Sequence, residues 1–266
     1  MLALTPITRR YLELLDALQQ SAIATTADGV IVDWNRSAES LYGWRRDEAL
    51  GRNVVDVTPA AVSREEASRI MSSLAAGEIW SGEFPVRTRS GESFIASVTD
   101  VPIVDERDHV VAVVGLSAPS RAAAPLATVL TRFSEACASL WPGRVKIAFG
   151  RSEATVPGTE PHILQLFALL LLRYAKPLES GESVDVSGRA ADASLFADFG
   201  IRGAAPAAYL RFGASPQRAW SVVRDEINGA RPTNFASALV RRIGGWLFVE
   251  SSGNELQTTH LLLPLV

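Results

Sequence analysis

The chain of 266 residues contains a single cysteine, Cys137, and only three histidines. One cysteine excludes an intramolecular disulfide and a multi-cysteine metal site, and it is typical of a reducing compartment. No cluster of histidines and carboxylates has the spacing of metal ligands, and no Gly-x-Ser-x-Gly segment indicates a hydrolase. We therefore predict no metal site, and the residues assign no catalytic group.

Long hydrophobic runs and a surplus of one charge are also absent. The most apolar stretch, residues 163–172, is interrupted by Gln165 and is far shorter than the ~20 residues that cross a bilayer. Arg9 and Arg10 follow a brief apolar start that lacks the core of a signal peptide. A net charge of -3 argues against an electrostatic nucleic-acid binder. We predict a cytoplasmic protein that binds neither membranes nor nucleic acids.

The first part of the chain alternates short helices and strands. Apolar residues at helical spacing predict an amphipathic helix within residues 1–20. The turn sequence Ala27-Asp28-Gly29 separates two β-rich runs, 22–26 and 30–34, and predicts a hairpin. Asn35 is then the expected N-cap of a short helix that ends at Gly43.

A second group of elements follows. Ser63 and Glu66 have the spacing of a capping box and predict the start of a helix that ends at Gly77. Strands are expected over residues 80–87, 93–101 and 110–115. Two hairpin strands, small helices and three antiparallel strands predict an α+β domain over residues 21–118.

Residues 119–142 are predicted to be a linker that contains one helix. Its apolar residues Leu126, Leu130, Phe133, Cys137 and Leu140 form a heptad stripe before Pro142-Gly143 ends the helix. The stripes of this helix and of the N-terminal helix lead us to expect a homodimer through both.

The remainder, residues 143–266, interleaves helices with strands, which predicts one mixed sheet covered by helices. The expected strands are 145–149, 183–187, 209–212, 246–251 and 258–263, and the expected helices are 161–175, 216–227 and 233–243.

The domain at residues 21–118 resembles a PAS sensor domain. The order and spacing of several segments carry the resemblance: Ala27 to Asn35, Ala38-Glu39, Gly43-Trp44, Asp47 to Arg52, Trp80 to Phe84, Ser90-Gly91 and Val101 to Gly115. The resemblance implies a five-stranded antiparallel sheet that encloses a pocket with its helices, and an N-terminal helix used for dimerisation.

The content of that pocket is left open between a flavin and another small molecule. Gly51-Arg52-Asn53 resembles the start of the flavin motif of light-sensing LOV domains, but Val54 stands where that motif has its photoreactive cysteine, which excludes that photochemistry. We expect Trp34, Val54 and Phe94 to line the pocket, with Trp44 and Trp80 as further aromatic candidates. His109 falls in a turn and is not placed as an axial haem ligand.

Residues 143–266 resemble the ATP-binding domain of sensor histidine kinases. The tail carries this resemblance, in Ala238 to Ile243, Gly244-Gly245, Trp246 to Ser251 and Thr258 to Leu265. Residues 164–175 have the profile of the helix that holds the magnesium-binding asparagine in that family. The resemblance implies an α/β sandwich that a helix joins to the first domain.

The chemistry of that family is incomplete in this chain. Tyr174 stands where the magnesium-binding asparagine is expected, and residues 231–237 lack the glycines of a nucleotide lid. Asp198, Gly200 and Gly203 are a remnant of the adenine-binding box. Alternatively the box falls at Gly213-Ala214-Ser215 and is lost. We therefore expect neither ATP nor magnesium to bind.

The phosphoacceptor histidine of such kinases is also missing, since residues 119–142 contain no histidine. His162 lies at the start of a helix and His260 inside a strand. We predict a bacterial signal-transduction protein, a non-catalytic relative of histidine kinases that acts by binding a response regulator or a sensor kinase. The alternatives are an atypical histidine kinase with a divergent nucleotide site around Asp198, and a flavin-containing redox or light sensor.

Overall fold

The computed structural model describes residues 6–60, 63–105, 107, 109–121, 125–149, 155–157, 159–172, 174, 178, 180–191, 207–215, 225–226, 236, 240, 243–252 and 255–265. The chain divides into two compact units. The N-terminal unit is Leu15–Arg121, and the C-terminal unit is Ala122–Val266 together with Met1–Leu14. Each is described separately below.

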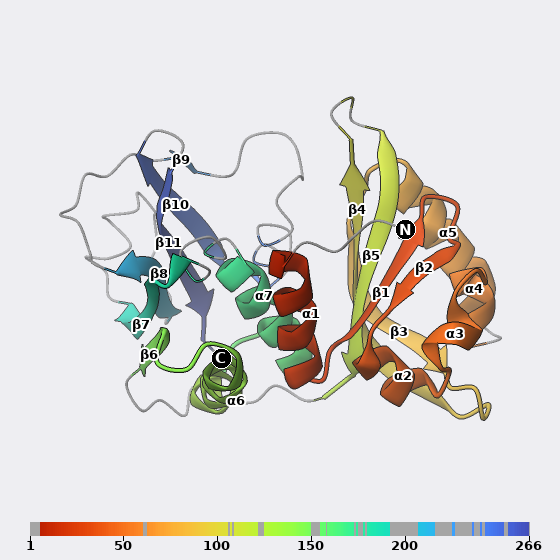
Figure 1. The fold of residues 1–266 in the computed structure, drawn as a ribbon, viewed down its shortest axis with the longest axis horizontal. Helices are drawn as coiled ribbons and strands as arrows, with labels where there is room; N and C mark the ends of the chain where they lie inside the picture. Colours follow the sequence, from red (N-terminus) through yellow and green to blue (C-terminus); the bar gives the residue numbers. More distant parts are fainter. Residues whose placement is uncertain are drawn as a thin grey trace. The chain divides into compact units, whose positions relative to one another are not determined.

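The N-terminal unit is a five-stranded antiparallel sheet with small helices on one face (Figure 1). The strand order is β2-β1-β5-β4-β3. The strands are β1 (Ser21–Thr26), β2 (Ile31–Trp34), β3 (Trp80–Arg87), β4 (Ser93–Val104) and β5 (Val110–Pro119). The helices are α2 (Arg36–Tyr42), α3 (Arg46–Ala49), α4 (Val54–Val57) and α5 (Arg64–Ala75), and α1 (Pro6–Ala17) precedes β1.

The ends of α2 confirm the sequence prediction. The Asn35 side chain accepts a hydrogen bond from the backbone N–H of Ala38 at 2.9 Å, and Gly43 ends the helix in a left-handed conformation with φ 74°. The capping box predicted for α5 is wrong. Ser63 is the N-cap, but its backbone is not extended, with φ -108° and ψ 4°, and its side chain makes no capping hydrogen bond.

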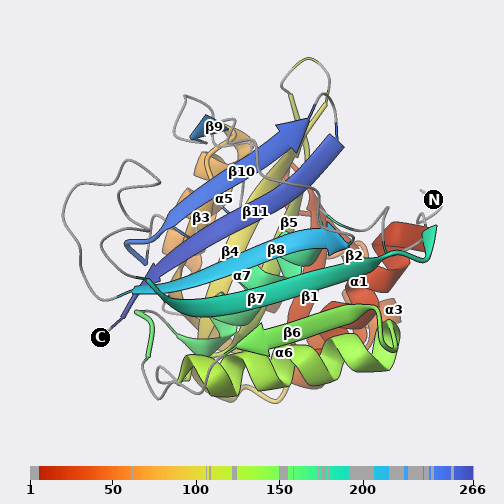
Figure 2. The same cartoon turned by 90° about the vertical axis from the view of Figure 1, so that its left-hand side faces the viewer.

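The C-terminal unit contains a six-stranded mixed sheet, as the interleaved pattern predicts. Its order is β6-β7-β8-β11-β10-β9, with β6 parallel to β7 and the other pairs antiparallel. The strands are β6 (Val145–Phe149), β7 (Ser183–Ala191), β8 (Ala207–Ser215), β9 (Asp225–Glu226), β10 (Trp246–Ser252) and β11 (Glu255–Pro264). Two helices, α6 (Leu126–Leu140) and α7 (Glu160–Leu172), accompany it; α7 lies behind the sheet in Figure 2, and α6 runs beside β6.

Aromatic side chains join α6, α7 and the sheet into one core. The ring centroid of Phe133 lies 5.6 Å from that of Phe167, which in turn lies 6.2 Å from that of Phe212. Leu130 and Cys137 of the same α6 stripe are buried, and so are Leu14 and Leu15 of α1. The apolar stripe of α6 is therefore largely covered within the C-terminal unit.

The helix predicted over residues 216–227 is wrong at its C-terminal end. Asp225 and Glu226 are extended and pair with Val249 and Phe248 at the edge of the sheet, so backbone pairing prevails there over the helical spacing. The rest of that segment, and most of the helix predicted over residues 233–243, lies outside the described residues; Ala236 and Val240 are helical.

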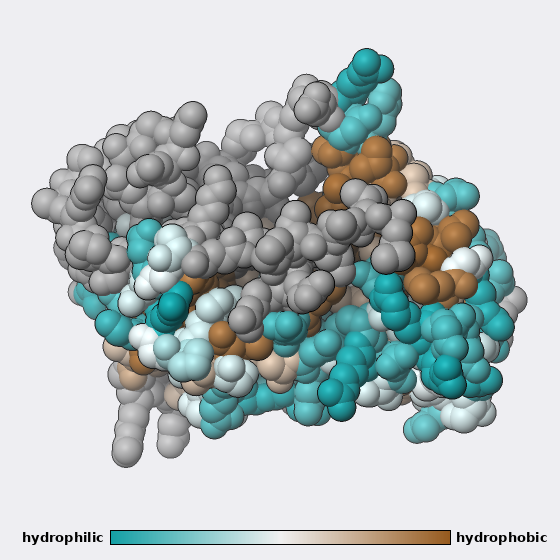
Figure 3. Space-filling model, in the orientation of Figure 1, coloured by the Kyte–Doolittle hydropathy of each residue, from teal (hydrophilic) through white to brown (hydrophobic). Residues whose placement is uncertain are grey.

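The β4–β5 hairpin exposes apolar side chains. Ile103, Val104 and Val111 are 44%, 37% and 52% exposed. Figure 3 shows apolar residues gathered at the base of this hairpin, below a hydrophilic tip. Over the described part of the chain, every helix is too short or too polar to span a membrane.

Candidate ligand-binding site

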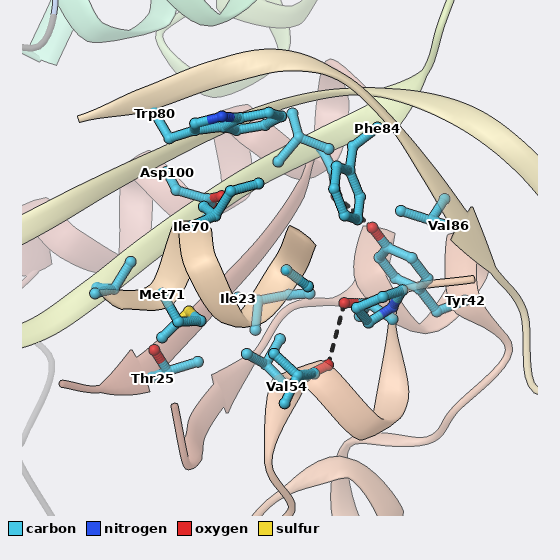
Figure 4. Close-up of a pocket in the computed structure, with 18 residues that line it drawn as sticks. Ile23, Thr25, Tyr42, Val54, Ile70, Met71, Trp80, Phe84, Val86 and Asp100 are labelled. Atoms are coloured by element: carbon cyan, nitrogen blue, oxygen red, sulfur yellow. Dashed lines mark hydrogen bonds between the residues drawn. The ribbon is translucent and has the colours of Figure 1, made fainter. Parts of the chain in front are cut away.

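The N-terminal unit encloses a cavity of about 80 Å³ between the inner face of its sheet and the helices α4 and α5 (Figure 4). Most of its wall is apolar, with Trp80 and Phe84 from β3, Ile70 and Met71 from α5, and Val54 from the start of α4. An apolar cavity with a few polar groups is the usual form of a small-molecule site. The polar groups of this one are Asp100, Thr25, Thr58, and the pair Tyr42 and Ser117.

Among the described residues, Asp100 is the only charged one that lines the cavity. It follows Ala96 and Val98 on the inward-facing side of β4, and it lies directly opposite Trp80 on β3 and Gly115 on β5. A Cβ atom placed on Gly115 would lie 2.5 Å from the Asp100 Oδ1 atom. The carboxylate therefore occupies the space that the absent side chain of residue 115 leaves on β5.

Burial raises the pKa of Asp100 to about 7, because the apolar surroundings disfavour the charged carboxylate. Among the described residues, none donates a hydrogen bond to this carboxylate or forms an ion pair with it. Asp100 therefore changes between its neutral and its charged form near neutral pH. No interaction with another described residue stabilises the charged form.

Thr25 and Tyr42 supply hydroxyl groups to the same cavity. Thr25 is only 4% exposed, and its Oγ1 atom has no hydrogen-bond partner within the described part of the chain. The Tyr42 hydroxyl lies 2.9 Å from the Ser117 Oγ atom, and burial raises the pKa of Tyr42, so that it stays neutral. Tyr42 is hydrogen-bonded within the protein, whereas Thr25 leaves a buried polar group available to a ligand.

Only some of the pocket residues predicted from the sequence line the cavity. Val54 and Trp80 line the cavity. Trp34 and Phe94 pack instead around Tyr42, with ring centroids 5.6 Å and 6.5 Å from it, and do not line the cavity. Trp44 lies between the guanidinium groups of Arg52 and Arg89, 4.6 Å and 5.1 Å from its ring. Sequence reasoning missed Asp100 and Thr25.

The cavity is small beside the sites that hold ligands of flavin size. Sites for ligands of that size usually measure about 300–1,000 Å³, whereas this one measures about 80 Å³. The side chains of Trp80, Phe84 and Met71 form part of its wall (Figure 4). The cavity suits a molecule of a few heavy atoms.

Of the nucleotide-site residues predicted in the C-terminal unit, only some belong to the described ranges. Asp198, Gly200 and Gly203 lie outside the described residues. Tyr174 is fully buried, and its hydroxyl donates to the Phe212 carbonyl oxygen at 2.7 Å and lies 3.0 Å from the Thr259 Oγ1 atom.

The three histidines lie in the elements predicted for them: His162 at the start of a helix, His260 in a strand and His109 in a turn. The His162 Nδ1 atom lies 2.9 Å from the Thr159 hydroxyl at the start of α7, and buried His260 lies in β11 with Nδ1 2.7 Å from the Tyr209 hydroxyl. His109 is largely exposed in the β4–β5 turn. In the described ranges, no group of three or more His, Cys, Asp or Glu side chains is arranged to hold a metal.

A comparison with protein-family models matches residues 9–116 to the family described as the PAS fold. The match covers the five-stranded sheet and the helices that enclose the cavity. The N-terminal unit contains a PAS domain. No curated protein matches the chain.

Solved structures with similar folds include a PAS domain from Colwellia psychrerythraea, which is 24% identical and covers 42% of this chain and 96% of its own, with a TM-score of 0.39. The blue-light activated histidine kinase EL346 of Erythrobacter litoralis is 15% identical and covers 92% of this chain and 95% of its own, with a TM-score of 0.44. A fungal LOV domain photoreceptor is 22% identical and covers 38% and 73%, with a TM-score of 0.33.

Proposed function

We propose that this chain is a signal-transduction protein whose PAS domain detects a small molecule in its cavity and whose C-terminal unit passes the signal on by binding another protein. The cavity carries the sensing half of the proposal. It combines an apolar wall with a carboxylate, Asp100, and a hydroxyl, Thr25, that have no partner among the described residues, as a site for a small polar molecule requires.

Two features support an output without phosphoryl transfer. The sequence resemblance places Tyr174 where histidine kinases hold magnesium, and its hydroxyl is committed to Phe212 and Thr259 inside the core. The two histidines of the C-terminal unit, His162 and His260, are both buried, whereas a phosphoacceptor must reach a nucleotide and a partner protein. We therefore propose that residues 143–266 are a non-catalytic relative of the histidine-kinase ATP-binding domain.

The proposed partner is another component of a two-component system, a response regulator or a sensor kinase. The PAS domain offers one surface for such contact, the exposed apolar residues Ile103, Val104 and Val111 of the β4–β5 hairpin. We also propose a homodimer through α1 and α6, as the sequence predicts, although Leu130 and Cys137 of the α6 stripe are buried. Light scattering tests the dimer, because a mass of twice 28.6 kDa supports it and the mass of one chain argues against it.

Titration calorimetry with magnesium and ATP tests the non-catalytic assignment. We expect no heat of binding from the full chain. Micromolar affinity that the Asp198→Ala variant loses would overturn the assignment and establish the divergent nucleotide site. An absorption spectrum of freshly purified protein tests the flavin alternative, because bands near 450 nm would show a bound flavin.

A further inference from the structure

The charge of the cavity points to one class of ligand. Of the described residues that line it, Asp100 alone is charged, and no lysine, arginine or histidine is present to balance it. The other titratable group in the wall, Tyr42, stays neutral because burial raises its pKa. A negative group in an apolar enclosure disfavours anions and favours cations.

The geometry around Asp100 keeps the carboxylate open to the cavity. On one side, Gly115 leaves room for the Oδ1 atom, which a Cβ atom would approach to 2.5 Å. On the other side, Trp80 lies directly opposite Asp100 in the β3–β4 pairing, so the two side chains are neighbours on the inner face. An aromatic face beside a carboxylate is a favourable surrounding for an organic cation.

Thr25 marks a second polar point in the same wall. It lies on β1, opposite Val113 of β5 and two residues along the ladder from Gly115, and its hydroxyl is buried without a partner in the described part of the chain. A buried hydroxyl without a partner is unfavourable unless a ligand or water binds it. Asp100 and Thr25 therefore provide two polar groups that make no hydrogen bond within the described residues. The other polar groups of the wall are hydrogen-bonded, namely Tyr42, Ser117 and Thr58.

From these observations we infer that the PAS cavity binds a small organic cation, an aliphatic amine of a few heavy atoms whose ammonium group contacts the Asp100 carboxylate. The apolar part of the amine packs on Trp80, Phe84 and Met71, and a polar substituent, where present, reaches Thr25. The cavity of about 80 Å³ sets the size, because a cavity of ~150 Å³ is what accepts benzene. This inference rests on the proposed sensing function and names its ligand class.

Three probes of similar size and different charge test the inference: n-propylammonium, 1-propanol and propionate. Each is titrated into the full chain carrying ¹⁵N-labelled tryptophan, and the indole signal of Trp80, assigned with a Trp80→Phe variant, reports occupancy. We expect n-propylammonium to bind at least tenfold more tightly than 1-propanol, and propionate not to bind. The affinity for n-propylammonium should rise between pH 6 and pH 8, because the pKa of Asp100 is about 7 and the amine stays protonated.

Matched variants locate the contact. Asp100→Asn keeps the shape of the side chain and should lower the affinity for n-propylammonium at least tenfold while leaving 1-propanol unchanged. Asp56→Asn, the same change on the exposed surface of α4, should leave both unchanged. Thr25→Val should weaken ethanolamine more than n-propylammonium.

The outcomes separate the two levels of the proposal. Preferential binding of 1-propanol or propionate, or equal binding of n-propylammonium to wild type and Asp100→Asn, would overturn the cation inference and leave a cavity that senses another molecule. If none of the three probes moves the Trp80 signal at any pH, both the cation inference and the sensing function fail.

Discussion

Replacing Asp100 by asparagine should stabilise the PAS domain at neutral pH. The pKa of Asp100 is about 7 in the folded chain, against about 3.9 for an unperturbed aspartate. A difference of about three units corresponds to ~4 kcal/mol of unfavourable free energy in the ionised state. Because the carboxylate borders a cavity that admits water, we expect about half of this, ~2 kcal/mol, to be recovered by Asp100→Asn at pH 8.

The sign of the pH dependence follows from proton binding. Between about pH 4 and pH 7 the folded chain holds a proton on Asp100 that the unfolded chain has released, so the stability of the wild type falls as the pH rises through this window. Above pH 7 both states are ionised and the full penalty is present. The advantage of Asp100→Asn should therefore shrink as the pH falls, to about a third of its pH 8 value at pH 5.

Urea unfolding at pH 5, 6, 7 and 8, followed by tryptophan fluorescence, measures this difference. Asp56→Asn is the control, because it makes the same chemical change at an exposed position and should show no such trend with pH. The reasoning is refuted if Asp100→Asn destabilises the domain at pH 8, or if its effect is the same at every pH.

Three further outcomes are expected from the same unfolding assay. Gly115→Ala should cost about 1–3 kcal/mol because its Cβ atom would lie 2.5 Å from Asp100, and adding Asp100→Ala should return part of that cost, whereas strict additivity would deny the contact. Tyr174→Phe should cost about 1–3 kcal/mol, since it leaves the Phe212 carbonyl oxygen without this donor, and a neutral effect would contradict the buried hydrogen bond. Val111→Lys should change stability by less than about 0.5 kcal/mol, because Val111 is 52% exposed; a larger loss would show that this hairpin surface is structural rather than available to a partner.

The fold was most predictable where local signals agree with the backbone. The bounds of α6, Leu126–Leu140, match the prediction because Pro125 precedes the helix and Pro142-Gly143 follows it. The bounds of β3 and β6 match the prediction too, but several other strands were predicted too short, as in β7, which runs to Ala191 rather than to residue 187. Its extension depends on pairing with β8, which no local pattern in residues 183–191 records.

The cavity was less predictable than the fold, because its polar residues are ordinary in sequence. A sensor pocket suggests aromatic candidates, yet Trp34 and Phe94 pack around Tyr42 rather than along the cavity. One signal for Asp100 was present: it continues the alternation of Ala96 and Val98, so a charged residue occupies an inward-facing position of β4. That Gly115 makes room for it depends on the register of β4 and β5, which the sequence does not specify.

A purely structural role does not account for Asp100, Gly115 and Thr25 together. Asp100 costs stability when ionised, Gly115 gives up side-chain packing in a central strand, and Thr25 buries a hydroxyl without a partner in the described part of the chain. An apolar residue at each of these positions would build a more stable core. All three residues line the same cavity. A ligand that binds both the carboxylate and the hydroxyl would offset the unfavourable free energy of Asp100 and of Thr25 together. A structural role assigned to each residue separately does not explain why these costs occur at one place.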